Sequence, residues 1–424
     1  MIDEVLTILF SVSILTFLPW CAIAISGRRR YPAHESMPVS VIIPAHNEES
    51  CIESTIQSVI AAHYDASVEI IAVDDGSTDA TAQILSRLST QDPRIKTIHT
   101  DHLGKALAVN RGVEAAQNEI VVMLDADSEI EPDALHKITA PFAQPKVGAV
   151  SGIICAKVNW NPLTWYQEFE YVLSTMGRII FDSIGCTYVV PGFAAFHKTA
   201  FMQTGGFSTD TLSEDWDIGL KMRKMGWGMV MSEARMYTTV PQTLGGIARQ
   251  RMRWGRGTIQ VLMKHRDMLF NRKYGLIGLY GMPNQVYFYV QGFIILPITF
   301  YQIFHGYLEY FVHWGNYLTW DVIKYFFGWM TMYGTFNFIN NTLTGVWPMT
   351  FSFPFFFASF ILINTYNMVA AIRISGLNLR FVPVIFLLFP YYLFTLGFFI
   401  YPLLLELNPL TRMRGHINIW EKTR

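Results

Sequence analysis

Short apolar runs alternate with amphipathic stretches from about Val39 to about Ala234. Four runs predict strands: Val39–Ile43, Val68–Val73, Ile95–Ile98 and Ile120–Leu124. Between them, apolar residues recur at helical spacing from Ile52 to Ile60, and Gly104–Ala116 predicts another helix. Strands that alternate with helices are typical of βαβ units on a mostly parallel sheet. We therefore expect an α/β domain with a Rossmann-like sheet in this part of the chain.

A hydrophobic run from Val5 to Ile25 is close to the roughly 20 residues that cross a bilayer. Arg28, Arg29 and Arg30 follow it, and this triple arginine predicts a cytoplasmic side. The acidic start, 1–4, differs from the basic start of a cleaved signal peptide. We interpret the run as an uncleaved signal anchor with the N-terminus outside, since its length and flanking charges disfavour a buried soluble helix.

The chain is almost wholly apolar and aromatic after about Tyr274. Four further spans are predicted: Leu279–Phe304, Val322–Ile339, Phe353–Ala371 and Phe381–Leu405. The second is interrupted by Asn337, Asn340 and Asn341 and has a re-entrant segment as its alternative. About five crossings in total would put the basic tail with Arg412 and Arg414 in the cytoplasm.

Several polar residues lie within or near these spans: Asn284, Gln285, Gln291 and Asn364. Polar side chains are costly when they face lipid. They would either line a path for a product or form hydrogen bonds between helices.

Composition supports a membrane protein with an attached catalytic part. Of 424 residues, 51% are hydrophobic and 15% are charged, with a mean hydropathy of +0.26. The net charge of -1 gives no basic field for a nucleic acid. Cys21, Cys51, Cys155 and Cys186 are scattered without metal-ligand spacing, so we expect neither a disulfide nor zinc.

The domain boundaries follow from these patterns. We expect an all-α transmembrane bundle joined to the α/β domain, in four segments: an anchor over 1–30, the α/β domain over 31–240, a basic interfacial segment over 241–275, and transmembrane helices with a tail over 276–424.

Carboxylates follow two of the predicted strands. Asp74–Asp75 and Asp125–Ala126–Asp127 each come directly after an apolar run, and ligands of open α/β sheets bind beyond such strand ends. The first pair would bind a nucleobase or ribose, although Asp-Gly-Ser is also a common turn and helix cap. The second has the spacing to hold a hard divalent cation that neutralises a diphosphate, although Asp-x-Asp also occurs by chance in loops.

A set of motifs in this order resembles glycosyltransferase family 2, and more narrowly its processive membrane synthases of poly-N-acetylglucosamine, hyaluronan, chitin and cellulose. The motifs are Val39–Glu49, the Val-Asp-Asp-Gly-Ser turn, Gly104-Lys105-Ala106, Asp125-Ala126-Asp127, Ser213-Glu214-Asp215 and Gln250-Arg251-Met252-Arg253-Trp254. The resemblance covers about residues 38–260 and implies a GT-A-type fold. Ser213 departs from it, because a threonine is more usual there.

The resemblance also implies a role for individual residues. The uridine pocket would contain Pro44, Ala45, Asn47, Glu48 and Asp75. Lys105 would lie near the nucleotide, Asp125 near its ribose and sugar, and Asp127 on the metal, Mn²⁺ or Mg²⁺. Asp215 would be the general base that deprotonates the acceptor hydroxyl, with Glu214 as its neighbour.

The acceptor side depends on two further segments. Gly192 lies in a stretch that would let the acceptor sugar approach the backbone, or that would be a buried strand and turn. Gln250 and Arg253 would bind the nucleotide sugar, Arg253 by a charge-assisted contact with the departing diphosphate. Trp254 would stack on the acceptor. This basic segment would also suit an interfacial helix at an anionic membrane, and both interpretations can be true of one helix.

The sequence therefore predicts an inverting, metal-dependent synthase that extends a β-linked polysaccharide from a UDP-sugar at the plasma membrane, with its catalytic domain in the cytoplasm. Its partners would be the donor, the growing chain, the bilayer and an accessory membrane subunit. One alternative transfers a single sugar to a lipid acceptor such as a polyprenyl phosphate. Another is a non-catalytic subunit that binds a nucleotide sugar, for which a carboxylate should be missing.

Overall fold

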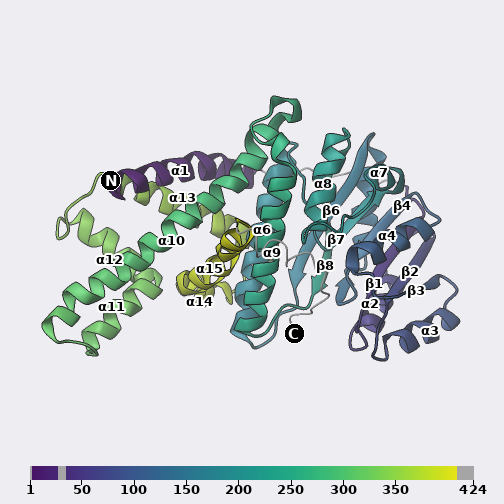
Figure 1. Cartoon of the computed structure of the whole chain (residues 1–424), viewed down its shortest axis with the longest axis horizontal. Helices are drawn as coiled ribbons and strands as arrows, with labels where there is room; N and C mark the ends of the chain where they lie inside the picture. Colours follow the sequence, from purple (N-terminus) through teal and green to yellow (C-terminus); the bar gives the residue numbers. More distant parts are fainter. Residues whose placement is uncertain (1, 27–34, 408–424) are drawn as a thin grey trace. The chain divides into compact units, whose positions relative to one another are not determined.

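The computed structural model describes residues 2–26 and 35–407, coloured along the chain in Figure 1. The predicted cytoplasmic signals Arg28–Arg30, Arg412 and Arg414 lie outside these residues. The chain divides into two compact units. One contains Arg29–Val158, Gly177–Pro283 and Pro402–Arg424, and is called the α/β unit below. The other contains Met1–Arg28, Asn159–Met176 and Asn284–Tyr401, and is called the helical unit.

Within the described residues, the α/β unit contains one eight-stranded sheet with the order β3-β2-β1-β4-β7-β6-β8-β5. The strands are β1 (Val39–Ala45), β2 (Val68–Asp75), β3 (Ile95–Thr100), β4 (Ile120–Leu124), β5 (Ser128–Ile130), β6 (Val147–Ala156), β7 (Phe193–His197) and β8 (Gly228–Thr238). Strands β1 to β4 confirm the four predicted apolar runs and pair in parallel. Strand β7 is antiparallel to both β4 and β6, so the sheet is mixed and rich in parallel pairs.

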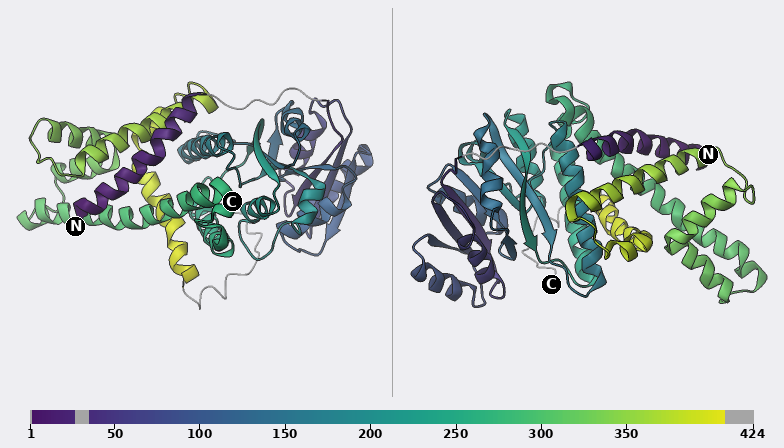
Figure 2. Two further views of the ribbon diagram at one scale, coloured as in Figure 1. Left: turned by 90° about the horizontal axis from the view of Figure 1, so that it is seen from above. Right: turned by 180° about the vertical axis from the view of Figure 1, so that it is seen from behind.

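Helices pack on both faces of this sheet, as Figures 1 and 2 show. On one face Val41 and Ile43 of β1 pack in a core with residues of α2 (Ile52–Ile60), α3 (Thr81–Gln91) and α5 (Ala134–Thr139). On the other face Ile42 packs with residues of α4 (Lys105–Ala115), α7 (Lys198–Gln203) and α8 (Glu214–Lys224). Successive strand residues point to opposite faces, so a strand covered on both sides is continuously apolar.

The helical unit contains α1 (Ile2–Ser26), α11 (Trp320–Met330), α12 (Met332–Leu343), α13 (Phe353–Ser375) and α14 (Phe381–Phe386), with most of α10 (Met282–Tyr310) and α15 (Leu388–Leu407). Helix α6 (Pro162–Ser183) begins in this unit and ends in the α/β unit. Figure 2 shows α1 alongside α13, and Cys21 of α1 donates to the Leu362 carbonyl of α13 at 3.3 Å.

Four helical segments of the described residues are long and apolar enough to cross a membrane: Ile2–Ser26, Ile277–Trp314, Phe353–Ser375 and Leu388–Glu406. The predicted single span Val322–Ile339 is wrong. The chain is extended at Thr331, with φ of -135° and ψ of 158°, between α11 and α12. At about 1.5 Å per residue, helices of 11 and 12 residues are too short for a core of about 30 Å. The odd count that placed the tail in the cytoplasm loses its basis, and the re-entrant alternative stays a prediction.

Polar side chains in the spans form bonds inside the helical unit. Gln291 of α10 donates to the Ser13 hydroxyl of α1 at 3.0 Å, and Tyr287 donates to the Leu9 carbonyl at 2.9 Å. Asn364 donates to the Phe360 carbonyl of its own helix at 2.8 Å. For Gln291 the helix-to-helix alternative therefore holds in this structure.

Candidate active site

Lys105 and Asp125 form an ion pair between the start of helix α4 and the end of strand β4. Lys105 is the first residue of α4, Asp125 follows β4, and the ammonium lies 2.6 Å from Asp125 Oδ1. Burial alone would lower the pKa of Lys105, but the charges of Asp125 and Glu214 more than offset it and raise that pKa above its usual value. The positive charge of Arg253, which belongs to α9 (Leu244–Lys264), opposes this rise in the pKa of Lys105. Three predicted site residues, Asp125, Glu214 and Arg253, therefore lie within electrostatic reach of Lys105.

Asp215 joins this cluster from the start of α8. Removal from water and the adjacent Glu214 carboxylate raise its pKa from 3.8 to about 6, against the opposing effects of Lys105 and Arg253. One carboxylate oxygen accepts a 2.9 Å hydrogen bond from the backbone N–H of Trp216. A carboxylate with a pKa this close to neutrality suits a general base, since it is ionised at pH 7 and still able to take a proton.

The Asp-x-Asp segment is held from both sides. The Ala126 carbonyl accepts from the Thr55 hydroxyl of α2 at 2.7 Å, and Asp127 Oδ1 accepts from the Thr238 hydroxyl of β8 at 3.2 Å. Asp125 and Asp127 remain partly exposed. Within the described chain, no three His, Cys, Asp or Glu side chains could hold a metal by themselves. An oxygen-only pair fits Mn²⁺ or Mg²⁺ if phosphate oxygens and waters complete the shell.

Asp75 organises the loop that leads to Lys105. Its side chain is fully buried and accepts from the Thr100 hydroxyl at 2.6 Å, Leu103 N at 2.6 Å and Gly104 N at 2.7 Å. Gly104 has a φ of 91°, which favours glycine. The predicted contact of Asp75 with a nucleotide stays a prediction, and the structure gives this carboxylate a role in shaping the loop.

The loops after β1 and β2 are tied together by Asn47. Its side-chain oxygen accepts from Thr78 N at 2.8 Å, and its own N–H donates to Ser77 Oγ at 3.0 Å. The other predicted residues of this pocket are Pro44 and Ala45, which end β1 in the core, and Glu48, which is 2% exposed. No contact with a uridine follows from these bonds alone.

Gly192 lies beside Asp125. It has a φ of 54°, and a Cβ at this position would stand 3.0 Å from Met236 Cε and 3.5 Å from Asp125 Oδ2. The segment continues into the buried strand β7. The alternative of a buried strand is thus confirmed for Phe193 onward, while the glycine itself borders the carboxylate cluster, and its contact with an acceptor stays a prediction.

Trp254 is covered by an arginine of its own helix. The Arg251 guanidinium lies 4.3 Å from the centre of the Trp254 ring and donates to Gln250 Oε1 at 2.6 Å. Arg251 is only 3% exposed, so this one arginine of the basic segment is not available to an anionic membrane surface, and the interfacial interpretation stays a prediction. Arg253 is exposed.

The end of α9 contacts α8, and the preceding turn of α9 contacts the segment just before α8. Asp217 of α8 is fully buried and contacts His265 Nε2 at 2.8 Å and Lys264 Nζ at 2.9 Å. Burial alone would raise the pKa of Asp217, but hydrogen bonds from His265, Ser208 and Lys264 hold it far below its usual range. Nearer the base, Leu212 N donates to Gln260 Oε1 of α9 at 2.9 Å.

Sequence patterns missed several of these residues. Thr55, Thr238, Asp217 and Gln260 act through contacts with distant parts of the chain, so no local spacing indicates them. His46 lies inside a recognised motif but was not selected. Its ring packs against His102, with the ring centres 4.3 Å apart and the planes tilted by 40°, and its Nδ1 lies 2.8 Å from the Asp75 carbonyl oxygen.

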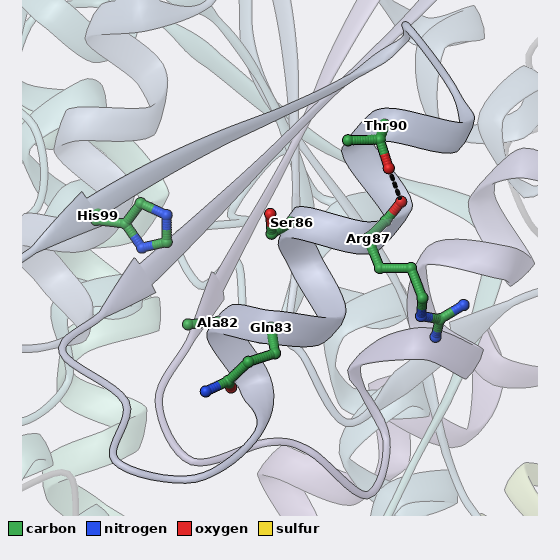
Figure 3. A pocket seen from close by; sticks show the side chains of 6 residues that line it. All are labelled: Ala82, Gln83, Ser86, Arg87, Thr90 and His99. Atoms are coloured by element: carbon green, nitrogen blue, oxygen red, sulfur yellow. Dashed lines mark hydrogen bonds between the residues drawn. The ribbon is translucent and has the colours of Figure 1, made fainter.

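A shallow hollow between α3 and β3 is separate from the predicted site. Its lining consists of Ala82, Gln83, Ser86, Arg87, Thr90 and His99, shown in Figure 3. None of these is a predicted site residue, although His99 bonds to Asp74 at 3.0 Å. The hollow therefore does not enter the chemistry below.

The family follows from comparison with known proteins. Residues 40–205 match the sequence profile of Glycosyl transferase family 2. The chain is 30% identical over 327 residues to the poly-beta-1,6-N-acetyl-D-glucosamine synthase of Staphylococcus epidermidis, which covers 76% of this chain and 75% of that protein. The chain belongs to glycosyl transferase family 2.

Two further proteins are similar to this family 2 member. The synthase of the same name from Staphylococcus aureus (strain COL) is 32% identical over 247 residues, 57% of this chain and 59% of that protein. The chain thus matches less than two thirds of the length of the S. aureus protein. A mannosyltransferase from Pyrobaculum calidifontis, solved with GDP-Man and Mn²⁺, has a TM-score of 0.60 at 20% identity and covers 88% of this chain and 97% of its own. At that identity the likeness shows the GT-A-type fold alone.

Proposed function

We propose that this family 2 member is a membrane-embedded, inverting synthase that extends a β-linked polysaccharide from a UDP-sugar. The observation that carries the proposal is Asp215, a carboxylate with its pKa raised to about 6, in one charged cluster with Lys105, Asp125, Glu214 and Arg253. Such a cluster supplies a base on the acceptor side and cations for a leaving diphosphate.

In this proposal Asp215 accepts the proton of an acceptor hydroxyl while the hydroxyl oxygen attacks the anomeric carbon of the donor. The bond between that carbon and the diphosphate oxygen breaks, and the electron pair leaves with UDP. Attack opposite to the leaving group inverts the anomeric centre. The exposed Arg253 guanidinium stabilises the negative charge that develops on the diphosphate.

Asp127, with Asp125 beside it, would hold Mn²⁺ or Mg²⁺ together with diphosphate oxygens. A bound cation would add charge neutralisation at the leaving group. Thr238 and Thr55 hold this segment by hydrogen bonds to Asp127 Oδ1 and to the Ala126 carbonyl.

N-acetylglucosamine is the donor sugar that we place first, because the staphylococcal relatives are named poly-beta-1,6-N-acetyl-D-glucosamine synthases. The four apolar segments support a multi-pass membrane protein. We place the α/β unit on the cytoplasmic side of the plasma membrane, on the basis of the triple arginine Arg28–Arg30. Passage of the product through the helical unit and an accessory subunit also belong to the proposal.

The test is a donor screen with the full-length protein in lipid nanodiscs and Mn²⁺ or Mg²⁺. Release of UDP from UDP-N-acetylglucosamine, UDP-glucose, UDP-glucuronic acid and UDP-N-acetylgalactosamine is measured in parallel. We expect one donor to be turned over, and Asp215→Asn to reduce turnover about a hundred- to ten-thousand-fold with UDP binding retained. Full activity of Asp215→Asn would remove this residue from the mechanism.

A further inference from the structure

A buried carboxylate at the end of α15 contacts α9. Helix α9 packs against Leu212 and Ser213, the segment just before Glu214 and Asp215, which is called the base loop below. Glu406 is 3% exposed, and its Oε1 accepts from Arg256 Nε at 2.8 Å and from Gln260 Nε2 at 3.2 Å. Both partners belong to α9. A buried carboxylate needs charge pairing and hydrogen bonds of this kind to offset its lost hydration.

Gln260 connects Glu406 to the base loop through hydrogen bonds at both ends of its amide. Its Nε2 donates to Glu406, and its Oε1 accepts from Leu212 N at 2.9 Å. An amide has one donor end and one acceptor end, so Glu406 fixes which end faces Leu212. Leu212 is three residues before Asp215, and α8 begins between them at Glu214. The position of the base therefore depends on an oriented Gln260 amide.

We propose that Glu406 is a positioning residue for the catalytic base, acting through Gln260 on the backbone at Leu212. The inference rests on the proposed function, because it treats Asp215 as that base. Glu406 is also the last residue of an apolar segment long enough to cross a membrane, Leu388–Glu406.

The bonds specify a charge-swap experiment. Gln260→Glu sets two carboxylates against each other and removes the donor to Glu406. Adding Glu406→Gln in the same chain removes this repulsion. In the parent, a single oxygen, Glu406 Oε1, accepts from both Arg256 and Gln260. In the double variant the amide at position 406 turns its nitrogen toward the new carboxylate at position 260 and its oxygen toward Arg256, while that carboxylate accepts from Leu212 N. The matched control is Glu309→Gln, the same change at an exposed position near the end of another apolar helix, α10.

The first readout is UDP release from the donor that the screen identifies, resolved into kcat and KM. We expect Glu406→Gln and Gln260→Glu each to lower kcat about ten- to a hundredfold with the KM for the UDP-sugar unchanged, because small displacements of a reacting group cost that much. The double variant should regain at least tenfold over Gln260→Glu alone, and Glu309→Gln should match the parent.

The proposal is overturned if the double variant is no faster than Gln260→Glu, if Glu406→Gln equals Glu309→Gln, or if only KM changes. A second readout is independent of activity. Hydrogen–deuterium exchange of the segment around Leu212 should be about five- to tenfold faster in Glu406→Gln than in the control, since a backbone hydrogen bond has lost its fixed acceptor.

This second readout also separates the two proposals. A parent protein that releases UDP from no donor refutes the proposed function. Faster exchange around Leu212 would then still support the positioning contact, and unchanged exchange would refute it.

Discussion

Gly257 of α9 packs directly against Ser213, the residue before Glu214 and Asp215. A Cβ at position 257 would overlap Ser213 Oγ and stand 2.9 Å from Ser213 N. Arg253 and Trp254 lie one turn earlier on the same helix. The absence of a side chain at Gly257 thus brings the predicted base and the predicted leaving-group and acceptor residues to neighbouring positions.

The first prediction is that Gly257→Ala lowers transfer at least tenfold, because the base loop must move away from α9. The matched control is Gly245→Ala in the same helix, where a Cβ would meet only Arg249 NH1 at 3.7 Å. Alanine favours a helix over glycine by about 1 kcal/mol, so the control should be at least as stable as the parent. The rate of UDP release is measured for both variants. If Gly257→Ala is as active as the parent, the close contact between α9 and Ser213 is not needed for transfer.

The second prediction concerns pH. Asp215 must be ionised to accept a proton, and its pKa is raised to about 6, so kcat/KM should fall as the pH drops below about 6. The Glu214 charge raises this pKa and Lys105 lowers it. Glu214→Gln should therefore move the acid limb to lower pH, and Lys105→Met should move it to higher pH. Profiles of kcat/KM from pH 4.5 to 8 measure both shifts. If neither substitution moves the acid limb, that limb reports the ionisation of a group other than Asp215.

How far the sequence predicts this molecule depends on how local each signal is. Strands β1 to β4 are continuous apolar runs because both faces of the sheet are covered, so their positions could be predicted. The insertion of β7 between β4 and β6 has no such signal, since strand order depends on contacts between distant segments. The predicted span 322–339 failed because average hydropathy does not register the extended residue at Thr331 that divides it.

The same contrast between local signals and contacts with distant segments applies to the candidate site. The chemical roles of Lys105, Asp125, Glu214, Asp215 and Arg253 stay predictions, but their motifs made them predictable as candidates, and they form one charged cluster. Their supports were not predictable, because Thr238, Gly257 and Gln260 contact residues 44 to 146 positions away. Such contacts exist only after folding, and neither composition nor spacing encodes them.

The third prediction concerns the metal. Asp127→Ala should weaken UDP binding in Mn²⁺ or Mg²⁺ and change it little in EDTA, because the carboxylate acts through the cation. Thr238→Val should have a smaller effect of the same kind, since it removes only the 3.2 Å bond that orients Asp127. Calorimetric titration with UDP measures both. An equal loss with and without metal would instead indicate a folding defect.

The fourth prediction concerns the acceptor. Trp254→Ala should leave hydrolysis of the UDP-sugar measurable while polymer synthesis falls, because water needs no stacking surface and a sugar terminus does. A loss on the order of 1–3 kcal/mol of stacking and apolar contact corresponds to a five- to hundredfold weaker hold on the acceptor. Trp254→Phe should retain more polymer.

The comparison of product length with UDP release in one preparation tests this role. The Arg251 guanidinium covers the Trp254 ring at 4.3 Å, so Arg251→Lys serves as a second probe of the same surface. Unaltered long polymer from Trp254→Ala would assign the tryptophan to the support of α9 and not to the acceptor.

The central claim is polymerisation from a nucleotide sugar, and the size of the product tests it most directly. Purified full-length protein in nanodiscs is incubated with radiolabelled UDP-N-acetylglucosamine and Mn²⁺ or Mg²⁺, and the product is sized with and without a specific N-acetylglucosaminidase. The account predicts long, enzyme-sensitive chains and one UDP released for each sugar incorporated. A product that stops at one sugar on a lipid, or UDP release with no sugar incorporated from any donor, would contradict it.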